Sequence, residues 1–143
     1  SGAFKNGQPQ GTWTRWYQNG QKSAELVYAD GKIEGKGTTW YPNGNKRSEK
    51  TFANDAETGT SRTWYPNGNL QSQSQMLRGI QTHLLTWDET GHLTSNLQFQ
   101  QGRRNGISLD WYANGNKRTE RTYQDDNLVS VRSWDENGKL LNE

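Results

Sequence analysis

The amino-acid sequence predicts an all-β fold: an elongated, twisted antiparallel meander built from six β-hairpin repeats of about 24 residues. Three observations support this prediction. A tryptophan recurs once per repeat, a turn sequence follows each tryptophan, and apolar and polar residues alternate between the turns. The recurring residues are Trp16, Trp40, Trp64, Trp87, Trp111 and Trp134, which are spaced 24, 24, 23, 24 and 23 residues apart.

The composition of the chain fits a repeat array better than a globular core. Apolar residues make up only 28% of the 143 residues, whereas globular domains usually contain about 45–50%. Low hydrophobicity is also typical of disordered chains, but a formal net charge of only +2, seven Trp and six Tyr argue against disorder. We divide this single repeat domain into six units, numbered repeats 1 to 6: residues 1–20, 21–44, 45–68, 69–91, 92–115 and 116–143.

Each recurring tryptophan precedes a tight turn, as in the segment Tyr41-Pro42-Asn43-Gly44. Proline suits the second position of a type I turn, and glycine suits a following residue with positive φ, so that a three-residue hairpin with a bulge is expected. We therefore expect structural roles for the six recurring tryptophans and for the glycines of these turns. Those glycines are Gly20, Gly44, Gly68 and Gly115.

A second turn lies about twelve residues from the first in every repeat. Its two residues favour the left-handed region of backbone conformation. The pairs are Asn6-Gly7, Asp30-Gly31, Asn54-Asp55, Arg78-Gly79, Gln101-Gly102 and Asp125-Asp126. Six hairpins joined by these two kinds of turn make a meander of about twelve strands, and a sheet of that length is expected to twist strongly.

Side chains between the turns alternate with period 2, which predicts strands with two distinct faces. Adjacent tryptophan and tyrosine residues before each turn must lie on opposite faces. The tryptophan position never varies, whereas the tyrosine position becomes Asp88 in repeat 4 and Asp135 in repeat 6. We expect the tryptophan face to be the packed one and the tyrosine face to be the wetter one. The tyrosine face is expected to carry Glu25, Glu49, Gln73, Asn96 and Glu120.

The repeated text resembles a known family. Segments such as Gly37-Thr-Thr-Trp-Tyr-Pro-Asn-Gly and Gly106-Ile-Ser-Leu-Asp-Trp-Tyr-Ala-Asn-Gly, each followed by a basic pair and a glutamate, are similar to the MORN-type repeat. They resemble most closely the bacterial variant found in YwqK-family antitoxin-like proteins. The resemblance covers essentially the whole chain. It implies a MORN-like solenoid of β-hairpins that binds other proteins or sits at membranes, and bacterial members include immunity proteins against secreted toxic effectors such as type VI lipases.

Repeat 4 departs from the pattern, because it lacks the tyrosine, the Asn-Gly pair and the usual glycine. It is also the most aliphatic part of the chain, and Leu84 and Leu85 cannot both face inward in a period-2 strand, so one of them is expected to be exposed. Exposed apolar patches often mark partner surfaces, and Tyr and Arg are favoured interface anchors. The predicted partner-binding residues are Tyr41, Tyr65, Tyr112, Arg103, Arg104, Ile80, His83 and Leu85.

No motif predicts catalysis or metal binding. The chain has no Cys and only two histidines, His83 and His92, so a zinc site would require carboxylate ligands as well. The acidic pairs fall at turn positions, where turn preference explains them. We therefore expect a non-enzymatic protein with no cofactor.

The expected partner is a cognate toxin or effector protein, neutralised by direct binding that blocks its active site. Basic pairs such as Lys46-Arg47 and Lys117-Arg118 could contact phosphate, but Glu49 and Glu120 interleave with them, so nucleic acid is not expected. The alternative function is an envelope-associated scaffold that contacts anionic lipid or cell wall without spanning the membrane. Open edge strands leave dimerisation as an option. The expected location is the periplasm or an outer-membrane anchor, with the cytoplasm as the alternative.

Overall fold

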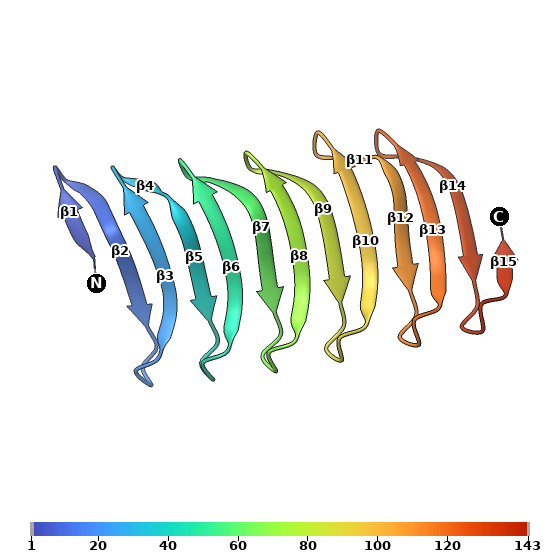
Figure 1. Ribbon diagram of the computed structural model, residues 1–143, viewed down its shortest axis with the longest axis horizontal. Helices are drawn as coiled ribbons and strands as arrows, with labels where there is room; N and C mark the ends of the chain where they lie inside the picture. Colours follow the sequence, from blue (N-terminus) through green and yellow to red (C-terminus); the bar gives the residue numbers. More distant parts are fainter. Residues whose placement is uncertain (1, 143) are drawn as a thin grey trace.

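The computed structural model describes residues 2–142, which form one open antiparallel sheet of 15 strands (Figure 1). The strands are β1 (Ala3–Lys5), β2 (Gln8–Trp16), β3 (Lys22–Ala29), β4 (Lys32–Ile33), β5 (Gly35–Trp40), β6 (Lys46–Ala53), β7 (Ala56–Trp64), β8 (Leu70–Leu77), β9 (Ile80–Trp87), β10 (Leu93–Gln100), β11 (Arg103–Arg104), β12 (Gly106–Trp111), β13 (Lys117–Gln124), β14 (Asn127–Trp134) and β15 (Leu140–Asn142).

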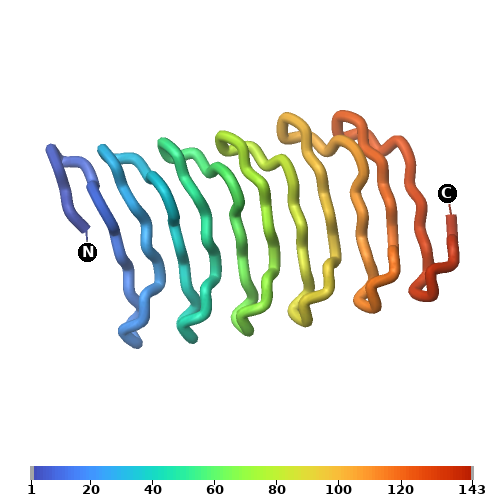
Figure 2. Tube along the Cα trace, viewed as in Figure 1, coloured from blue at the N-terminus to red at the C-terminus, as the bar shows by residue number. Residues whose placement is uncertain are grey.

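Each strand pairs with its neighbours in the chain, which confirms the predicted hairpin meander. The order along the sheet is β1-β2-β3-β5-β6-β7-β8-β9-β10-β12-β13-β14-β15, while the short β4 and β11 pair with β3 and β10. The two ends of the chain consequently lie at opposite ends of the long axis (Figure 2). More strands are present than the twelve or so expected, because backbone irregularities at Glu34 and Asn105 split two strands and because β1 and β15 are short additions at the sheet edges.

The two sets of turns occupy opposite edges of the sheet (Figure 1). At the edge that follows the tryptophans, the Gly44 N–H donates to the Tyr41 carbonyl at 2.9 Å, the Tyr41 N–H donates to the Asn45 carbonyl at 2.8 Å, and Gly44 has φ 89°. This is the predicted three-residue turn, and we call this edge the tryptophan-turn edge. At the other edge both residues of each pair have positive φ, for example 48° at Asp30 and 81° at Gly31, as a two-residue hairpin turn requires.

The repeated hexapeptide links successive repeats at the tryptophan-turn edge. The hydroxyl group of Tyr41 donates to the carbonyl of Trp64 at 2.8 Å, and the side chain of Asn43 donates to the carbonyl of Pro66 at 2.8 Å. Equivalent tyrosine bonds run from Tyr17 to Trp40, from Tyr65 to Trp87 and from Tyr112 to Trp134. We call this series of bonds the turn ladder. It gives an architectural reason for repeating the hexapeptide, because backbone carbonyls at the sheet edge gain donors.

The difference between repeats of 24 and 23 residues has a backbone cause. In the longer repeats a glycine with positive φ interrupts the strand pairing, at Gly11, Gly35, Gly59 and Gly106. The spacing to the tryptophans of repeats 4 and 6 is one residue shorter, and the corresponding residues His83 and Ser130 do not have positive φ. Their strands pair with a smaller irregularity, at Thr82 in β9 and at Val129 in β14. The absence of the positive-φ glycine and the shorter spacing therefore occur together, in repeats 4 and 6.

The prediction of which face carries the carboxylates is wrong. Lys22 lies 5.9 Å from the ring centres of both Trp16 and Trp40 and also forms an ion pair with Glu25 at 2.6 Å. Glu25 and the tryptophans therefore share one face. Cross-strand pairing places Glu49, Gln73, Asn96 and Glu120 in the same row as Glu25. The error arose because the bulge beside each turn shifts the alternation by one residue.

Neither face covers an interior. Within residues 2–142 no hydrophobic side chain is buried, and Ser61, at 6% exposure, and Ser108, at 4%, are the buried polar residues. Gly37 is buried as well. These small residues occupy equivalent positions, two residues after a bulge glycine, on the face opposite the recurring tryptophans. The expectation that the tryptophan face is the packed one is therefore not met, since the deepest positions lie on the tyrosine face.

Candidate functional site: an uncharged band at the centre of the sheet

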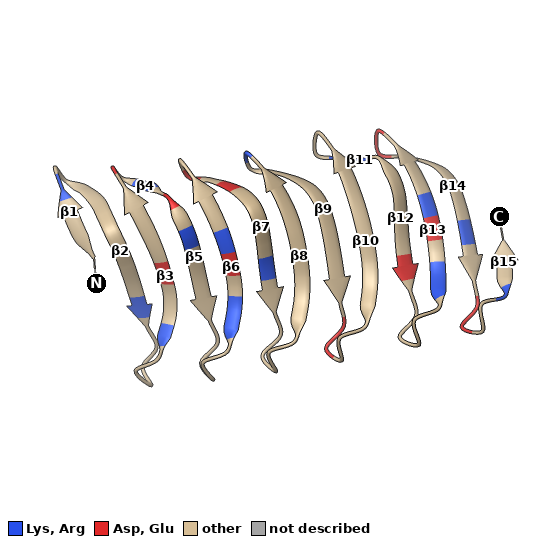
Figure 3. Ribbon diagram, in the orientation of Figure 1, with Lys and Arg blue, Asp and Glu red and all other residues tan. Residues whose placement is uncertain are grey.

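The three strands at the centre of the sheet carry no charged residue. Strands β8, β9 and β10 contain only apolar, hydroxyl, amide and histidine side chains, in a chain in which 22% of residues are charged (Figure 3). The strands on either side carry Lys, Arg, Asp and Glu. We call β8–β10 the uncharged band. It divides the sheet into two charged ends.

Leucines replace lysines between the tryptophans of the uncharged band. Lys46 lies 5.7 Å from the ring centre of Trp64, and Lys117 lies 5.0 Å from that of Trp134. In the band these positions hold Leu70, which pairs with Trp64, and Leu93, which pairs with Trp87. One apolar side chain per strand therefore runs across five successive strands. This apolar row is Trp64, Leu70, Trp87, Leu93 and Trp111.

A second row on the same face adds two more leucines. Leu85 pairs with Gln73 and Asn96, and Asn96 pairs in turn with Leu109. Leu85 and Leu109 lie two residues before Trp87 and Trp111, so their side chains share the tryptophan face. We define the central patch as the apolar row together with Leu85 and Leu109. All seven side chains are half-buried, so each leaves part of its surface open to a partner.

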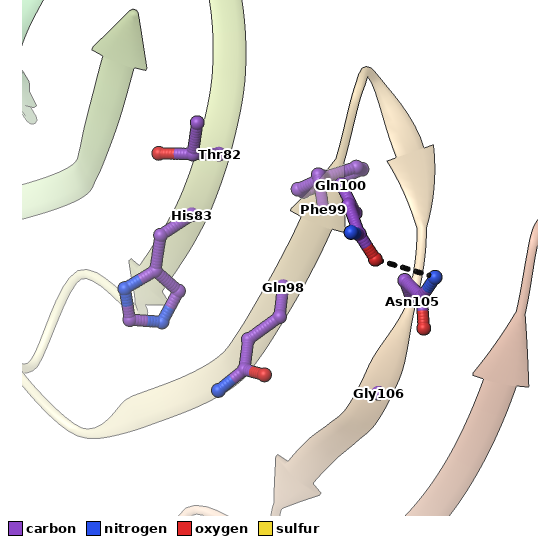
Figure 4. A pocket seen from close by; sticks show the side chains of 7 residues that line it. All are labelled: Thr82, His83, Gln98, Phe99, Gln100, Asn105 and Gly106. Carbon is purple, nitrogen blue, oxygen red and sulfur yellow. Dashed lines mark hydrogen bonds between the residues drawn. The ribbon is translucent and has the colours of Figure 1, made fainter.

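A shallow hollow adjoins the central patch between β9 and β12. Thr82, His83, Gln98, Phe99, Gln100, Asn105 and Gly106 line it (Figure 4). The side chain of Asn105 donates to Gln100 at 2.9 Å, and His83 Nε2 forms a short hydrogen bond with the Asn96 side chain. The hollow therefore offers amide and imidazole groups that can form hydrogen bonds beside an apolar surface, a combination typical of recognition sites.

The sequence-predicted partner residues do not form one surface. His83 and Leu85 lie on the tryptophan face within the uncharged band. Ile80, at 47% exposure, begins β9 at the edge of the two-residue turns, and Arg103 and Arg104 are exposed at that same edge. Arg104 lies 4.4 Å from the ring centre of Tyr123 and forms an ion pair with Asp126 at 3.4 Å. Their role in binding stays a prediction.

The three predicted tyrosines lie apart from that group. Tyr41, Tyr65 and Tyr112 are half-buried in the turn ladder, at the tryptophan-turn edge. Arg47 and Arg118 lie 5.8 Å and 5.7 Å from the ring centres of Tyr41 and Tyr112. Each tyrosine therefore has a structural role, whatever it contributes to binding.

The expectation of one exposed leucine in the Leu84-Leu85 pair is not met. The two side chains lie on opposite faces, as alternation requires, but both are half-buried because neighbouring strands flank each of them. The exposed apolar residues of repeat 4 are instead Leu77, at 61% exposure, and Ile80.

Sequence reasoning missed Leu70, Leu93 and Leu109. The signal was present, since the residue after the turn is lysine in three cases, Lys22, Lys46 and Lys117, and leucine in the other three, Leu70, Leu93 and Leu140. The significance of that position depends on its sharing a face with the tryptophans. Simple alternation does not show this, because the bulge shifts the side chains by one residue.

Repeat 4 also interrupts the turn ladder. Asp88 stands in the tyrosine position and accepts hydrogen bonds within its own turn, from Thr90 Oγ1 at 2.7 Å and from the His92 N–H at 3.0 Å. Within the described part of the chain, no side-chain hydrogen bond joins residues 88–92 to the next turn at 112–116. The junction between repeats 4 and 5 therefore lacks the link that the other four junctions have.

The Asp88 turn is expected to respond to acid. The hydrogen bond from Thr90 Oγ1, followed by that from the His92 N–H, lowers the pKa of Asp88 from the ordinary 3.8 to about 2. A lowered pKa in the folded state stabilises the fold above the unfolded pKa, and this contribution is lost as the pH falls from about 4 towards 2. Asp88→Asn keeps an acceptor oxygen but cannot ionise. We expect the melting temperature of this variant to fall less than that of the wild type over this window, as measured by circular dichroism; equal losses would contradict the assignment.

The described residues show neither a metal cluster nor a membrane-spanning helix. Nowhere in residues 2–142 do three or more His, Cys, Asp or Glu side chains gather as metal ligands. No helix in that part of the chain has the length and apolar character needed to cross a membrane.

Comparison with known protein families gives a match that follows the repeats. Residues 9–30, 33–54, 57–77 and 104–125 match the MORN repeat variant, which is a binding repeat without catalytic function. The matched segments leave out residues 78–103, which contain β9 and β10 of the uncharged band. No curated protein matches the chain. Since the matched segments cover more than half of the sequence and coincide with the hairpin units, the chain belongs to the family of MORN repeat variant proteins.

Proposed function

We propose that the protein is a non-enzymatic scaffold that binds another protein through the central patch. The observation that carries this proposal is the replacement of charged by apolar residues on one face of β8–β10, in a sheet whose other strands, except the short edge strand β15, each carry a charged residue. A family that binds through its repeats supplies the class of function. Repeat 4, which departs from the family pattern, supports the central patch as the proposed binding site.

The composition of the central patch supports a protein partner. The centres of protein interfaces are poor in charge and rich in aromatic residues, and their rims are polar. Here Trp and Leu occupy the centre, and Lys46, Arg62 and Lys117 border it. The lysines also occupy the flat sides of tryptophan rings, at 5.7 Å and 5.0 Å from the ring centres. Rings covered in this way are poor platforms for stacking sugars or bases.

We further propose that the partner is a toxic effector and that the protein is a bacterial immunity protein or antitoxin. The support is the resemblance of the repeated segments to YwqK-family antitoxin-like proteins. Binding across a flat patch would block the effector's active site or the approach of its substrate. This role places the protein in the periplasm or at the outer membrane, with a cytoplasmic antitoxin as the alternative. Pairing through the edges of β1 and β15 offers a route to dimers.

The second candidate function is an envelope-associated scaffold that contacts anionic lipid or cell wall. The alternation of tryptophan and lysine in repeats 1 to 3 favours it, because Trp and Lys together suit a membrane interface. Binding to vesicles that contain phosphatidylserine, with a steep dependence on salt, would support this candidate.

Two substitutions test the primary proposal without disturbing the fold. Leu85→Arg introduces the residue that repeats 3 and 6 already have at the equivalent position, Arg62 and Arg132. Leu93→Lys introduces the lysine that repeats 2, 3 and 6 have at its position, Lys22, Lys46 and Lys117. The double variant is expected to lower affinity for the partner by about 30-fold or more, since truncation or replacement of a central anchor costs about 2 kcal/mol. The partner would be identified by co-purification from native cells and the complex measured by calorimetry.

Thr38→Arg provides the matched control. Thr38 occupies the position of Leu85 in repeat 2, outside the central patch, so this variant is expected to bind like the wild type. Full binding by the Leu85→Arg, Leu93→Lys variant, together with a wild-type circular dichroism spectrum, would refute the proposed site.

A further inference from the structure

Charges of opposite sign occupy different parts of the sheet. Fifteen of the seventeen Lys and Arg residues lie in strands, the exceptions being Arg78 and Lys139. Of the fourteen Asp and Glu residues within residues 2–142, only five lie in strands. These five are Glu25, Glu49, Glu57, Asp110 and Glu120. The chain is nearly neutral overall, but its faces are cationic and its turns are acidic.

The tryptophan face shows this imbalance on both sides of the uncharged band. Its cations include Lys22, Lys36, Lys46, Arg62, Lys117 and Arg132, and its strand carboxylates are Glu25, Glu49 and Glu120. Cations on this face therefore outnumber strand carboxylates by at least two to one. A partner that covers the central patch must approach cations at both ends.

The carboxylates are also the less accessible members of their pairs. Glu49 is 17% exposed, whereas its partners Lys36 and Lys46 are 69% and 48% exposed. Glu120 is 24% exposed and Lys117 is 40% exposed. The hydrogen bond from Lys46 lowers the pKa of Glu49, and that from Lys117 lowers the pKa of Glu120, so both stay ionised beneath their lysines. The outermost charge on this face is therefore positive.

The bordered area has the size of a standard protein interface. Six strand spacings separate β6, which carries Lys46, from β13, which carries Lys117, and at about 4.8 Å each they span roughly 29 Å. A strand of eight residues is about 27 Å long. A stable complex covers about 800 Å² on each partner, which such an area provides.

We propose that the tryptophan face fits an acidic protein surface, with an apolar centre that meets the central patch and carboxylates on both sides of it. This inference rests on the proposed function and specifies the chemistry of the partner. Carboxylates on the partner would meet Lys36, Arg62 and Arg132, whose charges lie around the patch. The acidic turns at both sheet edges would repel the same partner, so that docking is restricted to the face.

A peptide library displayed on phage provides the probe. Selection on the immobilised wild-type protein is expected to enrich sequences that combine Trp, Phe or Leu with several Asp or Glu residues. The affinity of a synthetic copy of the best peptide is expected to fall at least tenfold between 50 mM and 500 mM NaCl, because exposed charge pairs are screened.

Two triple variants with the same charge change distinguish binding by the tryptophan face from non-specific attraction of an acidic peptide to a cationic protein. Lys36→Glu, Arg62→Glu, Arg132→Glu alters the tryptophan face, and Arg15→Glu, Arg47→Glu, Arg118→Glu alters the other face. We expect the first to weaken peptide binding tenfold or more and the second to weaken it less than threefold. Circular dichroism checks folding, and the salt titration of the wild type tests the charge argument independently of any variant.

The outcomes distinguish this inference from the proposed function. Selected peptides that lack carboxylates but lose binding in the Leu85→Arg, Leu93→Lys variant would overturn the acidic partner and keep the site. Peptides that bind that variant as well as the wild type would overturn both. Failure to enrich any peptide, or tight binding of vesicles containing phosphatidylserine or of single-stranded DNA through the same three cations, would overturn the acidic protein partner.

Discussion

Tyr65→Ala is expected to lower the free energy of unfolding by about 3 kcal/mol, because it removes a half-buried aromatic side chain and a link between repeats. The Tyr65 hydroxyl donates to the carbonyl of Trp87 at 3.0 Å and thereby joins repeat 3 to repeat 4. Tyr65→Phe deletes only this hydrogen bond and is expected to cost about 1 kcal/mol. Urea unfolding followed by circular dichroism measures both values.

Gln71→Ala is the control for this prediction. Gln71 is exposed and lies near the start of β8, at the same edge of the sheet. Its replacement is therefore expected to change stability by less than about 0.5 kcal/mol. If Tyr65→Ala were as mild as Gln71→Ala, the turn ladder would not stabilise the array. Hydrogen exchange adds a local measurement. In the Tyr65→Ala variant, the loss of amide protection should concentrate in repeats 3 and 4, as nearest-neighbour coupling requires.

Gly37→Val is expected to destabilise the protein by about 2 kcal/mol through overpacking. A Cβ atom at Gly37 would lie 2.6 Å from Leu26 Cδ2 and 3.1 Å from Phe52 Cε2, well inside normal contact distance. The φ angle of Gly37 is not positive, so the expected cost comes from side-chain contact alone. The measurement is again urea unfolding.

A rescue and a neighbouring substitution control for Gly37→Val. Adding Leu26→Ala removes the nearest clashing atom, so the double variant is expected to be more stable than the sum of the two single changes predicts. Thr38→Val places the same branched side chain one residue later, on the opposite face, and is expected to be nearly neutral. Strict additivity in the double variant would show that the contact with Leu26 is not the cause.

The fold could be predicted from the sequence because its determinants are local. Each Asn-Gly or Asp-Gly pair specifies its own turn, and the recurring tryptophans mark the spacing of the hairpins. Both signals can be recognised without knowledge of distant contacts. The strand order follows directly, since every strand pairs with its neighbour in the chain.

The faces could not be assigned correctly by simple alternation. One extra residue beside each turn, such as Arg47 between the pairs Trp40–Lys46 and Thr39–Ser48, shifts every side chain that follows. Simple alternation consequently places the carboxylates opposite the tryptophans and hides the leucines that replace the lysines. His83 and Leu85 were identified only because repeat 4 differs visibly from the others.

The absence of an interior has a consequence for how such a protein can evolve. In a layered domain, most side chains that differ between relatives lie outside the core, because changes within it leave holes or clashes. In this sheet both surfaces meet solvent, so a residue such as Leu85 can be exchanged while the backbone ladder and the edge turns hold the strands in place. One hairpin repeat can therefore diverge and acquire a new specificity while the other repeats preserve the architecture.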